Sequence, residues 1–206
     1  MQKVRQAAKT EELDYLFLLE CLSSYGKPRN KISALLKSGQ LIRVKKGLYV
    51  FGKDYQKRPY SLEVLANLIY GPSYVSLEYA LAYYDLIPEA VTRVTSVCSK
   101  RKKLFETPVG VFTYAYLSAS KYTTGVTWTS VDEHTHFLIA TKEKALADYV
   151  ARLKPFENKK DLLVYLVEGM RIDPEDLKVF DLSLMAEIAG VYQNKNVDFL
   201  WQNLKR

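Results

Sequence analysis

Six Lys or Arg residues fall within the stretch RNKISALLKSGQLIRVKKGLYVF, which contains no acidic residue. The stretch runs from Arg29 to Phe51 and also carries Asn30 and Ser33. Guanidinium and ammonium groups bind phosphate oxygens, and an Asn amide can read adenine through two hydrogen bonds. These residue types therefore predict contact with a nucleic acid, while an ordinary solvated basic surface is the alternative.

Placed on a helix, the first part of this stretch separates into two faces. Ile32, Leu35 and Leu36 share one side, which is expected to pack against the preceding helix. The opposite face is small and polar, with basic margins; it comprises Asn30, Ala34 and Lys37, flanked by Ser33 and Ser38, with Arg29 and Lys31 at the edges. Short side chains let a helix backbone approach a DNA major groove, although an amphipathic surface helix has a similar pattern.

A two-stranded ribbon is predicted directly after this helix. Residues 41–44 and 48–51 read as strands around the turn Lys45-Lys46-Gly47. A helix followed by a ribbon with a basic tip is the order of a winged helix-turn-helix, in which the wing lies along the DNA backbone. Arg43 stands on the ribbon, and the tip is expected to leave both lysines free to reach phosphates. This order favours DNA binding over a purely structural basic hairpin.

The elements around the stretch follow from local signals. Apolar spacing predicts a helix over residues 11–25, and Gly26-Lys27-Pro28 ends it. Pro28 is placed to open a second helix, which should run to about Ser38 before Gly39. A complete helix-turn-helix needs one further helix, which must come from residues 1–12 or from a division of 11–25.

The basic excess is confined to the first quarter of the chain. Residues 1–58 contain 13 Lys/Arg and 5 Asp/Glu, for a net charge of +8, whereas residues 59–206 contain 17 and 18, for a net charge of −1. The polar segment 52–59 lies where the balance changes and is predicted to be a linker. The sequence therefore predicts two domains, a DNA-binding domain over 1–58 and a larger domain over 59–206.

Composition indicates a globular chain, with 48% hydrophobic and 26% charged residues. The sequence has no apolar run close to the ~18 residues that span a bilayer. Its N-terminal residues lack the pattern of a secretory signal. Cys21 and Cys98 lie far apart without metal-ligand spacing, which favours reduced thiols. We expect a cytoplasmic location and no membrane partner.

The larger region is predicted to be a mixed α and β domain that ends in helices. Half-buried strands are rich in Val, Thr, Tyr and Phe. Helices often begin after an Asp or Thr, whose side chain caps the first turn. Strands are expected at 91–97, 110–116, 123–131 and 136–141. Helices are expected at 61–70, 76–85, 142–153, 159–170, 175–180, 182–191 and 197–204. The expected fold class is α+β, with a winged helix-turn-helix at its N-terminus.

Signals for catalysis are sparse. The sequence lacks the lipase, zinc-protease, phosphate-loop and dinucleotide-binding patterns. The segment DEHTH places His134 and His136 on one face if it is a strand, and such a pair can bind a metal ion. The alternative is that both histidines simply lie at the exposed end of a strand and bind no metal ion. The prediction is no catalysis and no cofactor or metal, with a metal-dependent nucleic-acid-processing enzyme as an alternative.

Two further groups of residues are candidates for binding. Lys100, Arg101, Lys102 and Lys103 fall in a predicted turn, where they either contact RNA, DNA or an acidic protein, or simply face water. The aromatic residues Tyr79, Tyr83, Tyr84, Tyr114, Tyr116, Tyr122 and Trp128 either form a binding platform or cover the core with their hydroxyls at the surface.

Four segments in this order resemble the AbiEi antitoxin family of the AbiE abortive-infection toxin–antitoxin systems. They are LLKSGQLIRVKKGLYVF, YVSLEYALAYYDLIPEAVTRVTSV, SKRKKLFETPVGVFTY and LIATKEKALADYV. The resemblance covers most of residues 25–152, and the segments before and after match only in general character. It implies an N-terminal winged helix-turn-helix that binds inverted repeats in its own promoter and represses the operon.

The resemblance also implies roles for individual residues and partners. A C-terminal domain would counteract a nucleotidyltransferase-like toxin, with no catalysis by the antitoxin itself, and Lys100–Lys103 is the first site to test. The residues that would face bases are Asn30, Ser33 and Lys37, and those that would hold phosphates are Arg29, Lys31, Arg43, Lys45 and Lys46. A transcription regulator without a toxin, whose second domain senses a ligand or protein, is the alternative.

Overall fold

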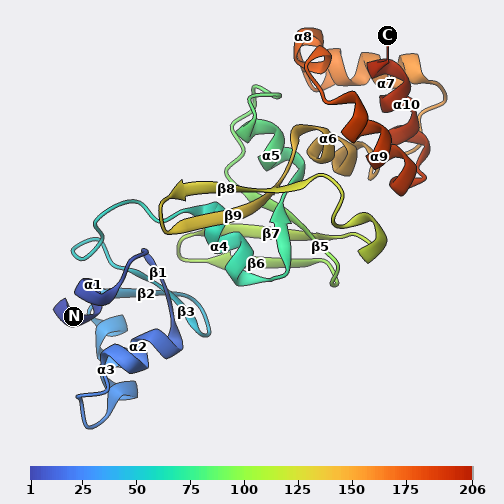
Figure 1. The fold of residues 1–206 in the computed structure, drawn as a ribbon. Coiled ribbons are helices and arrows are strands. Elements are labelled where there is room, and N and C mark those ends of the chain that lie inside the picture. Colours follow the sequence, from blue (N-terminus) through green and yellow to red (C-terminus); the bar gives the residue numbers. More distant parts are fainter. Residues whose placement is uncertain (206) are drawn as a thin grey trace.

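The computed structural model of the protein describes residues 1–205 and is mixed α+β, as predicted. It contains a three-stranded and a six-stranded sheet. Figure 1 shows the N-terminal helices at one end of the molecule, the larger sheet in the middle and the C-terminal helices at the other end. Within the described residues, every helix is too short or too polar to cross a membrane.

Residues 1–51, the N-terminal region, combine three helices with the small antiparallel sheet. In chain order the elements are α1 (Gln2–Ala7), β1 (Glu12–Asp14), α2 (Tyr15–Cys21), α3 (Pro28–Lys37), β2 (Leu41–Lys45) and β3 (Leu48–Phe51). The strand order is β1-β3-β2, so β3 lies in the centre of the sheet. The helices and sheet enclose their own hydrophobic cluster, to which Val4, Leu18, Leu35 and Phe51 contribute.

The prediction of one helix over residues 11–25 is wrong at its N-terminal end. Residues 12–14 form β1, where Glu12 pairs with Val50 in an antiparallel register. The helix begins at Tyr15 because the Asp14 carboxylate accepts a hydrogen bond from the Phe17 N–H at 2.8 Å. Residues 2–7 form a separate helix, α1.

The larger region begins with two helices and the six-stranded sheet. Its elements are α4 (Leu62–Ile69), β4 (Ser73–Val75), α5 (Leu77–Tyr83), β5 (Val94–Cys98), β6 (Lys103–Thr107), β7 (Gly110–Tyr116), the 3-10 turn η1 (Ala119–Lys121), β8 (Val126–Asp132) and β9 (Thr135–Ala140). The strand order is β6-β7-β5-β4-β9-β8. The pairs β5–β7 and β4–β9 are parallel and the remaining pairs are antiparallel.

Two of these strands were not predicted. The strand β4 has only three residues, between Pro72 and Ser76, which is too short for an alternating pattern to be recognised. The strand β6 lies at the edge of the sheet with Lys103 and Leu104 exposed, so it lacks the apolar content of a buried strand. The sequence pattern predicts connections between other elements at both positions.

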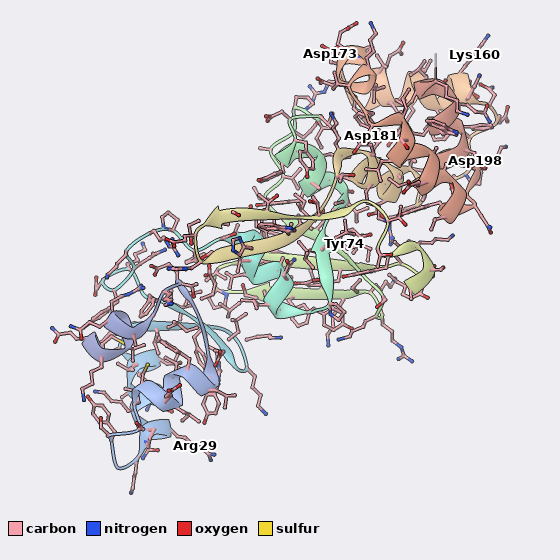
Figure 2. All side chains as sticks on the ribbon, in the orientation of Figure 1. Arg29, Tyr74, Lys160, Asp173, Asp181 and Asp198 are labelled. Carbon is pink, nitrogen blue, oxygen red and sulfur yellow. The ribbon has the colours of Figure 1, made fainter. Side chains whose placement is uncertain are left out.

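Helices make up the rest of the chain, as predicted. They are α6 (Lys142–Val150), α7 (Lys159–Val164), the π-helical turn η2 (Tyr165–Gly169), α8 (Pro174–Lys178), α9 (Leu182–Tyr192) and α10 (Lys195–Leu204). Side-chain caps set several of their starts; for example, Asp173 and Asp181 accept hydrogen bonds from backbone N–H groups of α8 and α9. Figure 2 labels both residues at the end of the molecule far from α3.

The ribbon of β2 and β3 packs against the larger region. Val44, Leu48 and Val50 of the ribbon belong to the same hydrophobic cluster as the core of the larger region. The two regions therefore share apolar contacts, in addition to the separate cluster that the N-terminal region encloses.

The predicted linker, residues 52–59, also contacts both regions. The Arg58 guanidinium donates a hydrogen bond to the Lys9 carbonyl and another to the Thr135 hydroxyl, each at 3.2 Å. It also forms an ion pair with Asp132 at 2.5 Å. The Arg58 side chain thus connects the predicted linker to the N-terminal region and to the larger region.

Candidate nucleic-acid interface

Burial of one face of α3 determines which of its side chains meet solvent. Pro28 occupies its first turn, where the missing N–H costs no helical hydrogen bond. Ile32 and Leu35 are 3% and 2% exposed, and both belong to the N-terminal cluster. The opposite side of the helix is consequently directed to solvent, as the pattern of apolar residues predicted.

The exposed face of α3 carries four of the eight predicted contact residues. Arg29, Asn30, Ser33 and Lys37 are all exposed. The Ser33 hydroxyl donates a hydrogen bond to the Arg29 carbonyl at 3.1 Å, so its donor is already used within the helix. In Figure 2, Arg29 lies at the outer end of the N-terminal region, away from the six-stranded sheet. The helix therefore presents polar and cationic groups at an open end of the molecule.

Lys31 differs from its neighbours on the helix. It is half-buried, and its ammonium lies 5.3 Å from the centre of the Tyr25 ring. This contact holds the side chain beside the turn between α2 and α3, where it sits at the margin of the exposed face.

The C-terminal half of α3 and the strand β2 border a shallow hollow of about 530 Å³. Three predicted contact residues line it, namely Ser33, Lys37 and the exposed Arg43. Pro108, from the turn between β6 and β7, forms part of the same hollow. The structure thus brings helix and ribbon residues together with Pro108 of the larger region, which no local pattern near α3 indicates.

The two lysines at the tip of the ribbon have different surroundings. Lys46 is exposed, while Lys45 is half-buried and its ammonium donates a hydrogen bond to the carbonyl of Ile69. The strand register shifts between Arg43 and Lys45, and such a bulge redirects a side chain. The prediction that both tip lysines are free is therefore wrong for Lys45.

The surroundings of Lys45 also affect its protonation. Burial lowers the pKa of Lys45, and the nearby ammonium groups of Lys100 and Lys103 lower it further. The ribbon tip and the basic turn of the larger region are therefore neighbours, although they are far apart in the sequence.

The predicted basic turn ends earlier than expected, because Lys103 is the first residue of β6. The Lys100 ammonium donates a hydrogen bond to the Gly71 carbonyl at 2.5 Å and lies 5.4 Å from the centre of the Tyr70 ring. The Lys103 ammonium lies 5.8 Å from the same ring. Two cations of this group are thus placed around the end of α4.

The remaining two cations of the turn face solvent. Arg101 and Lys102 are exposed, and within residues 1–205 neither forms an ion pair. The same holds for Lys45, Lys46, Lys100 and Lys103 in the described part of the chain. The ribbon tip and this turn therefore form a surface of positive charge without carboxylate partners.

The two histidines lie in different parts of the hairpin formed by β8 and β9. His134 is in the turn rather than in a strand, and both rings are exposed. His136 is hydrogen-bonded to Ser130 at 3.0 Å and lies edge-on to Trp128, with ring centres 5.2 Å apart. In residues 1–205, no three His, Cys, Asp or Glu side chains gather closely enough to hold a metal ion.

A buried polar network in the larger region was not predicted. The Asp148 carboxylate accepts hydrogen bonds from Tyr74, Ser76 and Tyr192, and Lys144 lies one helical turn away at 3.9 Å. Figure 2 labels Tyr74 in the interior of the sheet. In the sequence, this network is indicated only by the four-residue spacing of Lys144 and Asp148, which places them on one helix face. The same spacing is common on exposed helices, so it does not predict burial.

Burial is the main cause of the pKa shifts in this network. It lowers the pKa of Lys144 to about 8 and raises the pKa of Asp148. The Lys144 ammonium is fully buried and donates hydrogen bonds to the Lys121 carbonyl at 2.5 Å and the Tyr192 hydroxyl at 2.7 Å. These contacts join η1, α6 and α9, and they assign the network to holding the fold together rather than to an open site.

No protein-family model matches this sequence, and a comparison with curated proteins finds no match either. The function is therefore argued from the residues and their arrangement.

Proposed function

We propose that the protein is a sequence-specific DNA-binding regulator whose residues 1–58 act as a winged helix-turn-helix. The order α1-β1-α2-α3-β2-β3, with a β1-β3-β2 sheet, supports this proposal. In such a domain the last helix enters the major groove and the ribbon that follows lies beside it on the backbone. Residues 59–206 would form a second domain with a separate role.

The observation that carries the proposal is the exposed polar face of α3. Asn30 stands on that face without a hydrogen-bond partner among residues 1–205, so its amide is available to the two edge atoms of an adenine. Arg29 and Lys37 border it as exposed cations that would meet phosphates or a guanine edge.

The ribbon would supply the backbone contacts. Arg43 and Lys46 are exposed on the ribbon and would each neutralise a phosphate. Lys45 would contribute less, because its ammonium is held by the Ile69 carbonyl. This division assigns the sequence-independent part of the affinity mainly to Arg43 and Lys46.

We further propose that the regulator is the antitoxin of a toxin–antitoxin pair. It would repress its own operon through inverted repeats and counteract a nucleotidyltransferase-like toxin in the cytoplasm, without catalysis of its own. This part rests on the resemblance of residues 25–152 to AbiEi antitoxins. The larger region, with its six-stranded sheet and helical end, would carry the activity against the toxin.

A mobility-shift titration tests the DNA-binding part. The full chain is titrated onto the duplex upstream of its own gene and onto a shuffled duplex of equal length and composition. We expect at least tenfold tighter binding to the upstream duplex, which corresponds to about 1.4 kcal/mol. Equal affinities for the two duplexes at moderate salt would overturn the proposal of sequence-specific binding.

Growth rescue tests the antitoxin part separately. The neighbouring nucleotidyltransferase-like gene is expressed with this chain or with an empty vector. Rescue by the chain supports the antitoxin role. Specific DNA binding without rescue supports the alternative of a regulator that senses a ligand or protein through its larger region.

A further inference from the structure

An open hollow of about 940 Å³ lies beside the basic turn on the larger region. It is lined by Tyr70, Ser99, Lys100, Arg101, Lys102 and Tyr116. The lining includes three cations and two aromatic rings, and it includes no acidic residue. The sheet brings these groups together because Tyr116 pairs with Cys98, the residue that precedes the turn.

The cations of this hollow are free to bind an anion. Arg101 and Lys102 are exposed and have no ion-pair partner among the described residues. Lys100 is anchored to the Gly71 carbonyl, which satisfies one donor and leaves the charge uncompensated. Positive charge gathered without a carboxylate attracts a ligand that carries several negative charges.

The two tyrosines differ in their surroundings: the ring of Tyr70 is packed, and the ring of Tyr116 is exposed. The Tyr70 ring packs against Phe105 and Tyr114, with ring centres 5.7 and 5.2 Å away, and its hydroxyl donates to the Arg101 carbonyl at 3.4 Å. Tyr116 is 55% exposed, while its backbone is paired with Cys98 in the sheet. The hollow therefore offers an exposed aromatic face at a position where the backbone is paired in the sheet.

From this arrangement we propose that the hollow binds single-stranded nucleic acid, with a base stacked on Tyr116 and neighbouring phosphates on Arg101 and Lys102. Aromatic faces combined with cations are the usual means of binding unpaired strands, because every base has a face that can stack. In a duplex the bases are already stacked inside the helix, so an exposed ring beside the cations adds nothing to backbone binding. The site is separate from the face of α3 and does not depend on it.

The test measures fluorescence anisotropy of labelled single strands of about 10 nucleotides, as RNA and as DNA. An abasic strand of equal length and a duplex of equal length are measured alongside. We expect Tyr116→Ala to weaken binding of the single strands about fivefold or more, and Tyr116→Phe to retain it. Binding of the abasic strand and of the duplex should be unchanged by either substitution.

A second variant tests the cations. Arg101→Ala with Lys102→Ala should reduce the magnitude of the log–log salt slope for single strands by about 0.7 for each phosphate that the variant no longer neutralises. Lys154→Ala with Lys160→Ala removes two exposed cations from the C-terminal end of the larger region and serves as the matched control. Tighter binding of RNA than of DNA would identify RNA as the ligand, and the reverse would identify DNA.

Two results would overturn the proposal. One is an unchanged single-strand affinity in Tyr116→Ala, verified as folded by its circular dichroism. The other is equal affinity of the wild-type protein for the abasic and the base-containing strand. Either result would show that no base stacks in the hollow.

Discussion

Both regions of the molecule bury an ion pair, and the two pairs differ in their surroundings. In the N-terminal region Arg5 pairs with Glu11 beside the ring of Phe51, while Arg29 and Lys37 are exposed on α3. The larger region keeps Lys144 and Asp148 fully inside, where hydroxyl groups and a carbonyl satisfy them. Lysine is therefore exposed on α3 and fully buried in the larger region, and only burial distinguishes the two settings.

The largest effect should come from the buried network. Asp148→Ala removes the only carboxylate near Lys144 among the described residues and leaves a buried ammonium without its countercharge. We expect a loss of about 3–5 kcal/mol in the free energy of unfolding, measured in urea. Glu187→Ala, an exposed acid on α9, is the control and should change stability by less than about 0.5 kcal/mol. A small effect of Asp148→Ala would mean that the network is open to water.

A smaller effect is expected on the exposed helix face. Asn30→Ala should leave stability unchanged, because the side chain is exposed. It should cost about 1–3 kcal/mol of binding free energy at one base position of the operator and relax the preference there. Binding measured against all substitutions of the operator shows this directly. A uniform loss across every position would place Asn30 on the backbone instead.

Lys144, which is buried, should make the stability of the protein depend on pH in a range where exposed lysines have no effect. The pKa of Lys144 is lowered to about 8 in the folded protein, against 10.5 for a free side chain. Unfolding therefore takes up a proton between about pH 8 and 10.5, so raising the pH through this window favours the folded state. We expect Lys144 to contribute a gain of about 1–2 kcal/mol between pH 8 and 9.5.

Urea denaturation of the wild type and of Lys144→Met at several pH values in this window measures that contribution. The gain should be missing from Lys144→Met and retained in Lys160→Ala, which removes an exposed lysine. The same slope in both variants would assign the proton uptake to another group.

The smallest expected effect distinguishes the two lysines at the ribbon tip. Lys46→Ala should weaken binding to all duplex sequences and reduce the magnitude of the log–log salt slope by about 0.9. Lys45→Ala should change the slope less, because its ammonium is held at Ile69. Salt titrations of the two single variants make the comparison. Equal slopes for both would show that Lys45 leaves its carbonyl partner when DNA is bound.

The parts of the fold that the sequence predicts are those marked by apolar periodicity, prolines or capping residues within the element itself. Pro28 and the apolar spacing of Ile32 and Leu35 locate α3 within a residue, and the exposed face follows from the same periodicity. The strand β1 could not be predicted, because Leu13 has the spacing of the helix that follows it. Its pairing with β3 is a tertiary interaction that overrides the local pattern.

The sequence predicts which residues of the candidate site are exposed better than it predicts which of them lie next to one another. Exposure of Lys46 follows from its place in the polar turn, and exposure of Arg43 is expected from its charge rather than from strand alternation, because Leu41 two residues earlier is buried. The position of Lys45 depends on the end of α4, which lies 24 residues away in sequence, and local patterns carry no information about that contact. The hollow beside Tyr116 likewise depends on the parallel pairing of β5 and β7.

The fixing of Arg58 to Lys9, Thr135 and Asp132 has a geometric consequence for a protein seated on DNA as proposed. The segment between the two regions transmits rotation, so the orientation of α3 in a groove sets the direction in which the far helices α7–α10 point. Two copies on sites separated by whole helical turns would project those helices from the same side of the duplex. An insertion of half a turn between the sites would place them on opposite sides, so helical phase would decide whether the far helices of two copies point in the same direction.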